Sequence, residues 1–388
     1  MRFLTVSDED IKQGVVTDRY FIWTEKVLEA KKVNPEVVAE VTTSDWGIFA
    51  GLNDVLKLFE GLPVDVYAMP EGAMFFPHEP VITIVGKYLS FARYETSLLG
   101  FICHASAVAT EAFKFKLAAG DKKVFSFGTR RMHPALAAMI ERAAYIGGVD
   151  GVSNFAAEKY LGIPSMGTMP HAMIICFGDQ VKAWRCFDEV VDKGVPRTML
   201  VDTYFDEKTE AILAVENVER VDAVRLDTPS SRRGKFRKIV EEVRWELDIR
   251  GRKDVKIFVS GGLSLRDVIE LRDLVDAFGV GTSISMCPSV DIAMDIIEVE
   301  IDGEWKPISK RGKMPGAKQY YRCANHPWIH SVRPWKSSAP LCDLCNNPME
   351  SMLKKYVEDG KIIVERLPDI VEVRNYVLSQ IFKLPEPI

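Results

Sequence analysis

The chain has 388 residues, of which 47% are hydrophobic and 27% charged, and its formal net charge is −5 at pH 7. This length is enough for two or three domains with sizeable cores, and the charge gives no basic field of the kind that nucleic-acid-binding proteins use. No apolar run approaches the roughly 20 residues of a membrane span, and the N-terminus MRFLTVSDED lacks a signal-peptide core. We therefore expect a cytoplasmic protein that binds neither nucleic acid nor a membrane.

The first part of the chain, residues 1–118, mixes helix and strand patterns. Apolar residues at helical spacing predict helices, and alternating residues predict short strands. The predicted helices are residues 17–31, 46–59 and 98–119, and the predicted strands are 37–42, 64–69 and 81–85. This region is expected to form an N-terminal α+β domain.

From residue 119 to residue 290 the pattern changes to regular alternation of strand and helix. About seven short apolar runs are each followed by a helical pattern. The predicted strands include 124–127, 149–152, 165–167, 198–201, 223–226 and 255–259, and the helices between them include 133–146, 154–161, 172–191, 206–219 and 232–249. Such spacing predicts parallel strands with right-handed crossovers, in a barrel or a doubly wound sheet. A barrel is favoured because distinctive residues follow many strands rather than one switch point.

After residue 290 the alternation ends. Residues 296–301 and 305–308 predict a hairpin around Asp302-Gly303, and we expect the strands of residues 291–310 to rejoin the N-terminal sheet. Residues 311–388 form the predicted C-terminal domain, with a loop-rich segment and a closing helix over 369–382. The predicted fold class is α/β, with an irregular (β/α) barrel, an N-terminal α+β domain and a small C-terminal zinc-binding segment.

Polar residues at the ends of the predicted barrel strands form the main candidate site. They are Arg130, Asp150, Ser153, His171, Asp202, Arg225 and Asp227. Each has a plainer interpretation alone, such as a helix cap for Asp150. Asp202 and Asp227 each follow a buried strand directly, and two such carboxylates suit Mg²⁺ held through a diphosphate and ribose hydroxyls. Arginine suits a carboxylate or phosphate partner, because its guanidinium forms paired hydrogen bonds.

Two glycine turns follow the last two predicted strands. They are Ser260-Gly261-Gly262 and Gly279-Val280-Gly281-Thr282. Without Cβ atoms, the backbone N–H groups of such turns can approach an anion closely. The loops after the last two strands of a (β/α) barrel commonly bind phosphate. We therefore predict a sugar-phosphate site here, although glycines also simply end strands.

An aromatic pair and one histidine are further candidates. Phe127 and Tyr20 could stack on a flat ring, although plain core packing also explains them. His171 follows Gly167-Thr168-Met169-Pro170 and begins a predicted helix. A histidine at a helix N-terminus has its neutral form favoured and can act as a nucleophile or base.

A cysteine-rich segment near the C-terminus has metal-ligand spacing. Cys323-x2-His326 and Cys342-x2-Cys345 form two pairs of the kind found in structural Cys₃His zinc sites. His330 is a competing fourth ligand, and unligated cysteines in a loop are the alternative interpretation. A closed four-ligand zinc site would hold the segment together without taking part in catalysis.

In order along residues 17–285, these pieces resemble the nicotinate phosphoribosyltransferase family. The matching pieces are Thr17-Asp18-Arg19-Tyr20, Pro70-Glu71-Gly72, Phe76-Pro77-His78-Glu79-Pro80, Tyr94-Glu95-Thr96, Phe127-Gly128-Thr129-Arg130-Arg131, Gly167-Thr168-Met169-Pro170-His171, Val201-Asp202-Thr203-Tyr204, Val224-Arg225-Leu226-Asp227, Ser260-Gly261-Gly262 and Gly279-Val280-Gly281-Thr282. The resemblance implies a reaction of nicotinate with phosphoribosyl pyrophosphate that gives nicotinate mononucleotide and pyrophosphate. It further implies Mg²⁺, coupled ATP hydrolysis, a role in NAD salvage, and a homodimer or larger homo-oligomer with a shared active site.

The resemblance also implies roles for single residues. Phe127 and a partner subunit's Tyr20 would enclose the pyridine ring, and Arg130 would face the pyridine or pyrophosphate groups. His171 would match the histidine that ATP phosphorylates. Arg225, Asp202 and Asp227 would bind ribose, Mg²⁺ and pyrophosphate, and Gly261, Gly262, Gly281 and Thr282 would hold the 5′-phosphate. Asp150, Ser153, Thr168 and Ser260 complete the predicted substrate-binding set.

One departure from the family pattern concerns ATP. The residues that flank His171 are Pro170 and Ala172, where the family usually has a small residue before the histidine and often Glu or Ser after it. This leaves open whether ATP use is obligatory.

Three alternatives also stay open. Quinolinate as substrate would need extra cations and no His171, and nicotinamide would favour an acidic partner such as Asp150. A non-catalytic zinc-bearing interaction protein would not need the convergence of strand-end residues.

Overall fold

The computed structural model describes residues 3–232, 234–381 and 383, and the chain forms two compact units. One comprises Met1–Thr110 and Pro288–Ile388 and is called the sheet unit below. The other, Glu111–Cys287, is called the barrel unit. Two predicted helices reach positions outside the described residues, at Arg233 and Phe382.

The barrel unit is built on a sheet of six parallel strands in the order β7-β6-β11-β10-β9-β8. The strands are β6 (Lys123–Ser126), β7 (Gly151–Val152), β8 (Thr198–Leu200), β9 (Ala223–Leu226), β10 (Lys256–Val259) and β11 (Ala277–Val280). Neighbouring strands follow chain order, and the last strand pairs with the first. This is the order of a barrel and not of a doubly wound sheet, which confirms the predicted class.

The barrel is irregular because it does not close. Where a further strand was predicted at residues 165–167, a single bridge joins Val152 to Ser165. Among the described residues, no pairing joins this bridge to β8. The barrel therefore has fewer than eight strands and is open on one side.

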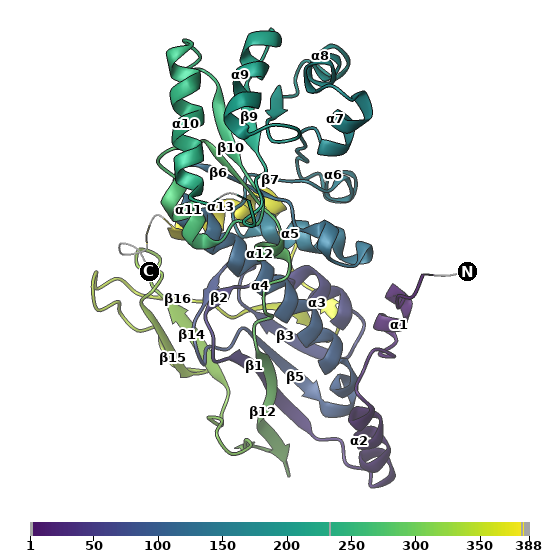
Figure 1. Ribbon diagram of the computed structural model, residues 1–388. Helices are drawn as coiled ribbons and strands as arrows, with labels where there is room; N and C mark the ends of the chain where they lie inside the picture. The colour runs from purple at the N-terminus through teal and green to yellow at the C-terminus, as the bar shows by residue number, and fades with distance from the viewer. Residues whose placement is uncertain (1–2, 233, 382, 384–388) are drawn as a thin grey trace. The chain divides into compact units, whose positions relative to one another are not determined.

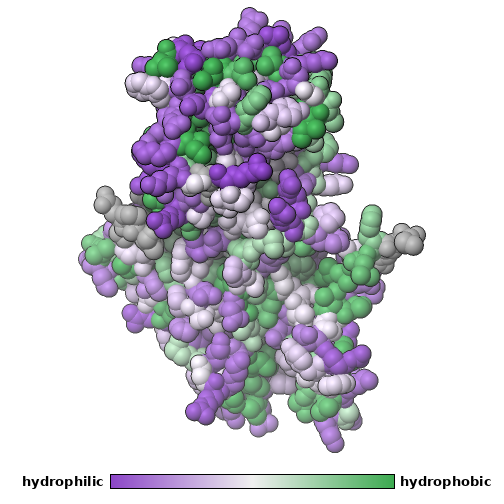
Figure 2. All heavy atoms as spheres, viewed as in Figure 1, coloured by the Kyte–Doolittle hydropathy of each residue, from purple (hydrophilic) through white to green (hydrophobic). Residues whose placement is uncertain are grey.

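Helices of the barrel unit connect successive strands. They are α5 (Ala137–Ile146), α6 (Phe155–Leu161), α7 (His171–Phe177), α8 (Gln180–Val190), α9 (Glu207–Asn217), α10 (Phe236–Ile249), α11 (Leu265–Leu271) and α12 (Thr282–Ser285). Figure 1 shows α9 and α10 beside β9 and β10. The buried residues of α10, Phe236, Val240, Val243 and Leu247, recur at helical spacing on its inner face. On the face that Figure 2 shows, many side chains over this unit are hydrophilic, and hydrophobic ones lie among them.

The prediction of one helix over residues 172–191 was wrong. Helix α7 ends at Phe177, and the next residue, Gly178, has a φ of 68° in the left-handed region that favours glycine. Asp179 then caps α8, since its Oδ1 accepts a hydrogen bond of 2.8 Å from the Lys182 N–H. The break makes α7 a short helix that begins at His171.

The sheet unit contains a seven-stranded sheet in the order β13-β12-β1-β5-β3-β17-β18. Its strands are β1 (Glu36–Thr43), β3 (Val64–Ala68), β5 (Ile82–Lys87), β12 (Ile292–Ile301), β13 (Glu304–Pro307), β17 (Lys354–Glu358) and β18 (Lys361–Ile362). The β12–β13 hairpin pairs with β1, as the sequence predicted for the returning strands. Because β17 pairs with β3, residues beyond 311 are part of this unit and not a separate compact domain.

The shorter helices of the sheet unit come from both ends of the chain. They include α1 (Asp8–Lys12), α2 (Arg19–Ala30), α3 (Leu52–Phe59) and α13 (Ile370–Ile381). The first part of the predicted helix 46–59 is instead strand β2 (Gly47–Ile48), which pairs with β4 (Met74–Phe75). Gly51, with φ of 101°, turns the chain into α3. The closing helix α13 is anchored by Gln380, whose Oε1 accepts from the Met74 N–H at 3.1 Å.

The long helix α4 (Glu95–Ala119) contains the predicted helix 98–119. With the preceding turn it forms a segment, Ala92–Ala119, that is long and apolar enough to span a membrane by length and composition alone. However, 61% of its apolar window is buried inside the structure. Such burial is typical of the core helix of a globular protein.

A small three-stranded sheet in the sheet unit carries the cysteine-rich segment. It consists of β14 (Lys318–Arg322), β15 (His330–Pro334) and β16 (Glu350–Ser351), in the order β15-β14-β16. The loop from β14 to β15 contains the first Cys/His pair, and the loop from β15 to β16 contains the second.

Candidate active site

A cavity of about 480 Å³ lies within the barrel unit, lined by residues that follow the barrel strands. The carboxyl ends of parallel strands meet at one edge of the sheet, so residues far apart in sequence converge there. The lining residues are Phe127, Arg130, Arg131, His171, Arg225, Asp227, Pro229, Ser230, Ser260, Gly261, Gly262, Gly279, Gly281 and Thr282. The structure therefore brings most of the predicted site residues to one cavity.

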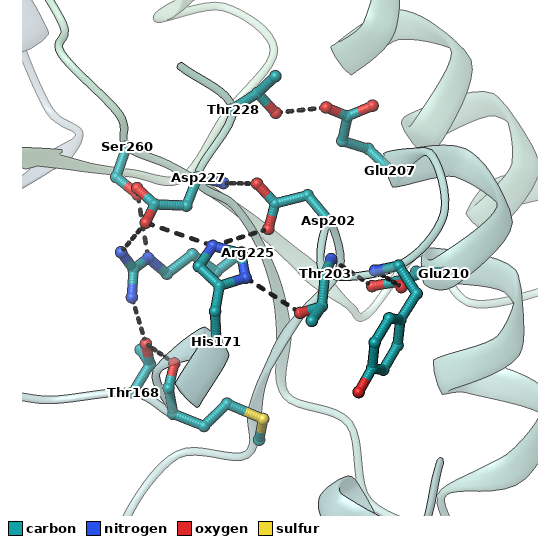
Figure 3. Close-up of polar contacts among 12 residues, drawn as sticks. Thr168, His171, Asp202, Thr203, Glu207, Glu210, Arg225, Asp227, Thr228 and Ser260 are labelled. Atoms are coloured by element: carbon teal, nitrogen blue, oxygen red, sulfur yellow. Dashed lines mark hydrogen bonds and ion pairs between the residues drawn. The ribbon is translucent and has the colours of Figure 1, made fainter. Parts of the chain in front are cut away.

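Arg225 is held by a network of side chains. Its Nε donates to Ser260 Oγ at 3.0 Å, and one terminal nitrogen donates to Thr168 Oγ1 at 2.7 Å. The other terminal nitrogen lies 3.0 Å from Asp227 Oδ2 (Figure 3). The guanidinium also lies over the Phe127 ring, 5.3 Å from its centroid. Arg225 is thus fixed in place before any substrate arrives.

Asp202 follows β8 and is buried beside the cavity. Its Oδ2 accepts a hydrogen bond of 3.1 Å from the Asp227 N–H. Its Oδ1 is buried and has no hydrogen-bond partner among the described residues. Burial, reinforced by the nearby carboxylates of Asp227 and Glu207, raises the pKa of Asp202 to about 7. A buried carboxylate oxygen that accepts no hydrogen bond, beside a second carboxylate, fits a hard divalent cation such as Mg²⁺.

The imidazole of His171 contacts Asp202 and Asp227 through one ring nitrogen and Thr203 through the other. Its Nδ1 lies 3.1 Å from Thr203 Oγ1, while its Nε2 lies 3.7 Å from Asp202 Oδ1 and 3.8 Å from Asp227 Oδ2 (Figure 3). Burial, reinforced by the charge of Arg225, lowers the pKa of His171 below its usual 6.5, although the carboxylates of Asp227 and Glu210 favour the imidazolium. The imidazole is therefore mostly neutral near pH 7, the form that can act as a nucleophile.

Two glycines at the cavity have no room for a side chain. A Cβ on Gly261, whose φ is 98°, would lie 2.9 Å from the carbonyl oxygens of both Asp227 and Thr228. A Cβ on Gly279 would lie 2.6 Å from Cε2 of Phe127. These close approaches explain why both positions are glycine.

Asp150 is a correction. The sequence pattern placed it at a strand end, but strand β7 begins after it. Its Oδ2 accepts from the Val124 N–H at 3.0 Å and pairs with Lys116 at 3.0 Å. Since Val124 lies near the start of β6, Asp150 lies at the end of the barrel opposite to the cavity.

Ser153 and Tyr20 are not among the residues that line this cavity. Ser153 does follow β7, but its hydroxyl donates over 3.4 Å to Oε1 of the fully buried Glu141. Burial raises the pKa of Glu141 to about 7. Tyr20 belongs to the sheet unit and lies on α2 with 53% of its surface exposed.

Arg131 and Glu210 are among the residues of the site that the sequence did not predict. Arg131 lines the cavity beside Arg130, in the turn η3 (Thr129–Arg131), and its position next to a predicted residue was a usable signal. Glu210 is fully buried beneath the loop after β8 and accepts hydrogen bonds from that loop. Nothing in the helical pattern distinguished it from a solvent-facing glutamate.

The cysteine-rich segment forms a compact candidate metal site. Its ligand atoms, from Cys323, His326, Cys342 and Cys345, all lie within 4.8 Å of one another. Cys323 Sγ lies 3.6 Å from both His326 Nδ1 and Cys345 Sγ, and Cys342 Sγ lies 3.6 Å from His326 Nδ1. A tetrahedron with Zn–S bonds of about 2.3 Å has edges of about 3.8 Å, so the four ligands fit zinc.

His330 is engaged elsewhere. Its Nδ1 pairs with the buried carboxylate of Glu79, and its ring stacks on Phe76 with centroids 4.9 Å apart. His326 is therefore the histidine that completes the four-ligand set.

Comparisons with known proteins agree with this geometry. Residues 18–106 match the family model of the quinolinate phosphoribosyl transferase N-terminal domain, and residues 108–295 match that of the C-terminal domain. Nicotinate phosphoribosyltransferase pncB2 of Mycobacterium tuberculosis is 31% identical over 334 residues, which cover 83% of this chain and 69% of the relative. A nicotinate phosphoribosyltransferase of Bacillus subtilis is 31% identical over 284 residues, covering 68% of this chain and 56% of the relative.

Solved structures show the same fold. The crystal structure of a nicotinate-nucleotide pyrophosphorylase from Pyrococcus furiosus is 52% identical, has a TM-score of 0.96, and covers 100% of both chains. The crystal structure of human nicotinic acid phosphoribosyltransferase is 20% identical with a TM-score of 0.73, and covers 95% of this chain and 94% of the human chain. At that identity the human structure supports the fold alone.

Proposed function

The chain belongs to the type II phosphoribosyltransferase family, and we propose that it is a nicotinate phosphoribosyltransferase. The reaction joins nicotinate to phosphoribosyl pyrophosphate and gives nicotinate mononucleotide and pyrophosphate. The observation that carries the proposal is the convergence of two glycine turns, Asp227 and Arg225 in one cavity with Phe127. Relatives that are named for this reaction support it.

Each part of the cavity suits one part of the substrates. The glycine turns, with Gly261 and Gly281, are suited to the 5′-phosphate, and Phe127 offers a ring on which the pyridine can stack. Arg130 and Arg131 are exposed at the same cavity and suit the carboxylate of nicotinate or the pyrophosphate. Asp202 and Asp227 would hold Mg²⁺, which stabilises the charge of pyrophosphate when bound.

The chemistry needs positioning more than a strong base. The pyridine nitrogen has a lone pair and attacks C1 of the ribose while the bond from C1 to the pyrophosphate oxygen breaks. Positive charge develops on the ribose ring, and negative charge develops on the leaving group. Arg225, fixed by Asp227, Ser260 and Thr168, is placed to neutralise that negative charge.

Coupling to ATP is part of the proposal. His171 would accept the γ-phosphoryl group, because a mostly neutral imidazole with one nitrogen held by Thr203 is a suitable nucleophile. The test is transfer of label from γ-labelled ATP to the protein, which His171→Ala should abolish. Normal labelling of the variant would contradict this role.

Quinolinate is the main alternative substrate, and one observation favours it. Arg225 is engaged within the protein, but the side chains of Arg130 and Arg131 have no hydrogen bond or ion pair to other described residues, and two such arginines could meet two carboxylates. The Pyrococcus furiosus protein is named for nicotinate nucleotide, which either reaction can form. Against quinolinate, His171 would have no use. Nicotinamide loses support because Asp150 lies away from the cavity.

A direct assay decides among these substrates. The purified protein is incubated with phosphoribosyl pyrophosphate and Mg²⁺, with and without ATP, and with nicotinate, quinolinate or nicotinamide in parallel. We expect nicotinate mononucleotide from nicotinate, with faster turnover when ATP is present. Turnover of quinolinate alone, with release of carbon dioxide, would overturn the proposal.

The remaining parts of the proposal concern assembly, zinc and cellular role. We propose a cytoplasmic homodimer in NAD salvage, in which the partner's Tyr20 completes the pyridine site, and a structural zinc at Cys323, His326, Cys342 and Cys345. Mixing Tyr20→Ala and His171→Ala variants, assayed for ATP-stimulated turnover, tests the shared site. If Tyr20 acts across subunits, mixed dimers recover activity, and if both residues serve one chain, they do not.

A further inference from the structure

Glu210 accepts three hydrogen bonds from consecutive backbone groups of the loop after β8. Its Oε2 accepts from the Thr203 N–H at 3.0 Å, and its Oε1 accepts from the N–H groups of Tyr204 at 2.7 Å and Phe205 at 3.0 Å. The residue is fully buried on α9, and Figure 3 shows its carboxylate turned toward Thr203. Consecutive N–H groups that point inward form an anion-binding nest, and here the chain fills that nest with its own carboxylate.

The loop that Glu210 holds leads directly into the active site. Asp202 and Thr203 stand at its start, and Thr203 Oγ1 lies 3.1 Å from His171 Nδ1. Asp202 Oδ1 lies 3.7 Å from the other ring nitrogen, Nε2. The orientation of the His171 ring therefore depends on where this loop places the Thr203 hydroxyl.

A role as a simple helix cap does not explain Glu210. The N-terminus of α9 is already capped by Asp206, whose Oδ1 accepts from the Thr209 N–H at 3.0 Å. Glu210 lies in the first turn of α9, but its carboxylate binds residues that precede the helix. A fully buried carboxylate is costly unless it is well bonded, so its three bonds point to a requirement for a fixed loop.

We propose that Glu210 is a positioning residue that fixes the loop after β8 so that Thr203 orients the His171 imidazole at the active site. The proposal deepens the function proposed above and rests on it for the kinetic effect. Its geometric part, the dependence of the His171 ring on Glu210, does not depend on which substrate the enzyme uses.

The informative variant is Glu210→Gln, which has nearly the same size as the native side chain. The amide oxygen can still accept from Tyr204 and Phe205, but the amide nitrogen would then face the Thr203 N–H, a donor against a donor. The variant should release Thr203 while keeping most of the packing. Thr203→Val removes the hydroxyl itself, and Glu216→Gln alters the same helix at an exposed residue as the matched control.

The first readout is the ¹⁵N chemical shift of His171 Nδ1, measured at one pH where the ring is neutral. The resonance is assigned because it is missing from the spectrum of His171→Asn. We expect Glu210→Gln to shift this resonance in the direction and by the amount that Thr203→Val does, and Glu216→Gln to leave it unchanged. Melting curves establish that each variant is folded. A folded Glu210→Gln protein with the wild-type resonance would overturn the proposal.

The second readout separates kcat from KM. Glu210→Gln should lower kcat of the ATP-coupled reaction about 10- to 100-fold, the effect expected from a misplaced reacting group. KM for nicotinate should stay close to wild type, because Phe127 and Arg130 lie on another loop. An unchanged kcat would overturn the kinetic role. A wild-type protein without activity on nicotinate would instead refute the proposed function, while the resonance of His171 would still test Glu210.

Discussion

Replacement of Asp202 by asparagine should make the protein more stable at alkaline pH. Burial raises the pKa of Asp202 from 3.8 to about 7, so the folded protein holds a proton that the unfolded chain releases. The contribution of Asp202 to the stability of the wild type is therefore fully present below its ordinary pKa of 3.8. This contribution is lost as the pH rises through the folded pKa of about 7. An asparagine side chain at this position does not ionise, so Asp202→Asn removes this loss.

The magnitude follows from the size of the pKa shift. One unit corresponds to about 1.4 kcal/mol, so between about pH 5 and about pH 8.5 the variant should gain about 2 to 3 kcal/mol of unfolding free energy relative to the wild type. Asp202 is well buried, with 8% of its side chain exposed, so solvent screens the effect little. The measurement is urea unfolding of both proteins at the two pH values, without divalent metal.

Two controls make this test specific. Asp206→Asn should change stability equally at both pH values, because a hydrogen bond from Thr209 lowers the pKa of Asp206 below its usual 3.8, and its contribution is lost only as the pH falls below that value. Mg²⁺ at the higher pH should stabilise the wild type but not Asp202→Asn, if the carboxylates bind the cation. A stability difference between Asp202→Asn and the wild type that is the same at both pH values would refute the reasoning.

Three further outcomes are expected. Gly279→Ala should raise KM for nicotinate about 10- to 100-fold with little change in kcat, because the new Cβ would force the Phe127 ring to move. Overpacking of this kind costs about 1–3 kcal/mol. An unchanged KM in steady-state kinetics would contradict this prediction. Arg225→Lys should lower kcat more than it raises any KM, since lysine cannot make all three contacts of the guanidinium; equal kcat would show that charge alone suffices. Elemental analysis should find one zinc per chain in the wild type, and the Cys342→Ser variant should contain no zinc and melt at a lower temperature. Wild-type protein that contains no metal and still melts normally would exclude a structural zinc.

Much of the active site could be predicted because its residues directly follow recognisable strands. Asp202 and Asp227 each come after a buried run, and parallel strands bring such positions to one edge. The glycine turn at Gly261 was recognisable for the same reason. The Cys/His set was recognisable from spacing alone, because two short-spaced pairs are needed to surround one ion.

Other features could not be predicted, and each failure has a local cause. Strand β7 has two residues, so the sequence pattern could not show that Asp150 stands before it and not after it. Gly178 is compatible with a helix interior in sequence, but its left-handed backbone divides α7 from α8. Glu210 looked like a solvent-facing residue, because its partners are backbone N–H groups of a loop.

The sequence by itself determined the order of strands and helices, the two glycine turns, and the side chains that follow each strand. These properties depend on local periodicity and on residue type, which a single chain displays directly. Only the tertiary structure decided that β11 pairs with β6, that residues beyond 311 join the N-terminal sheet, and that His326 rather than His330 faces the cysteines. Such contacts join residues distant in sequence, and their geometry exists only once the backbone hydrogen bonds and the packed cores have formed.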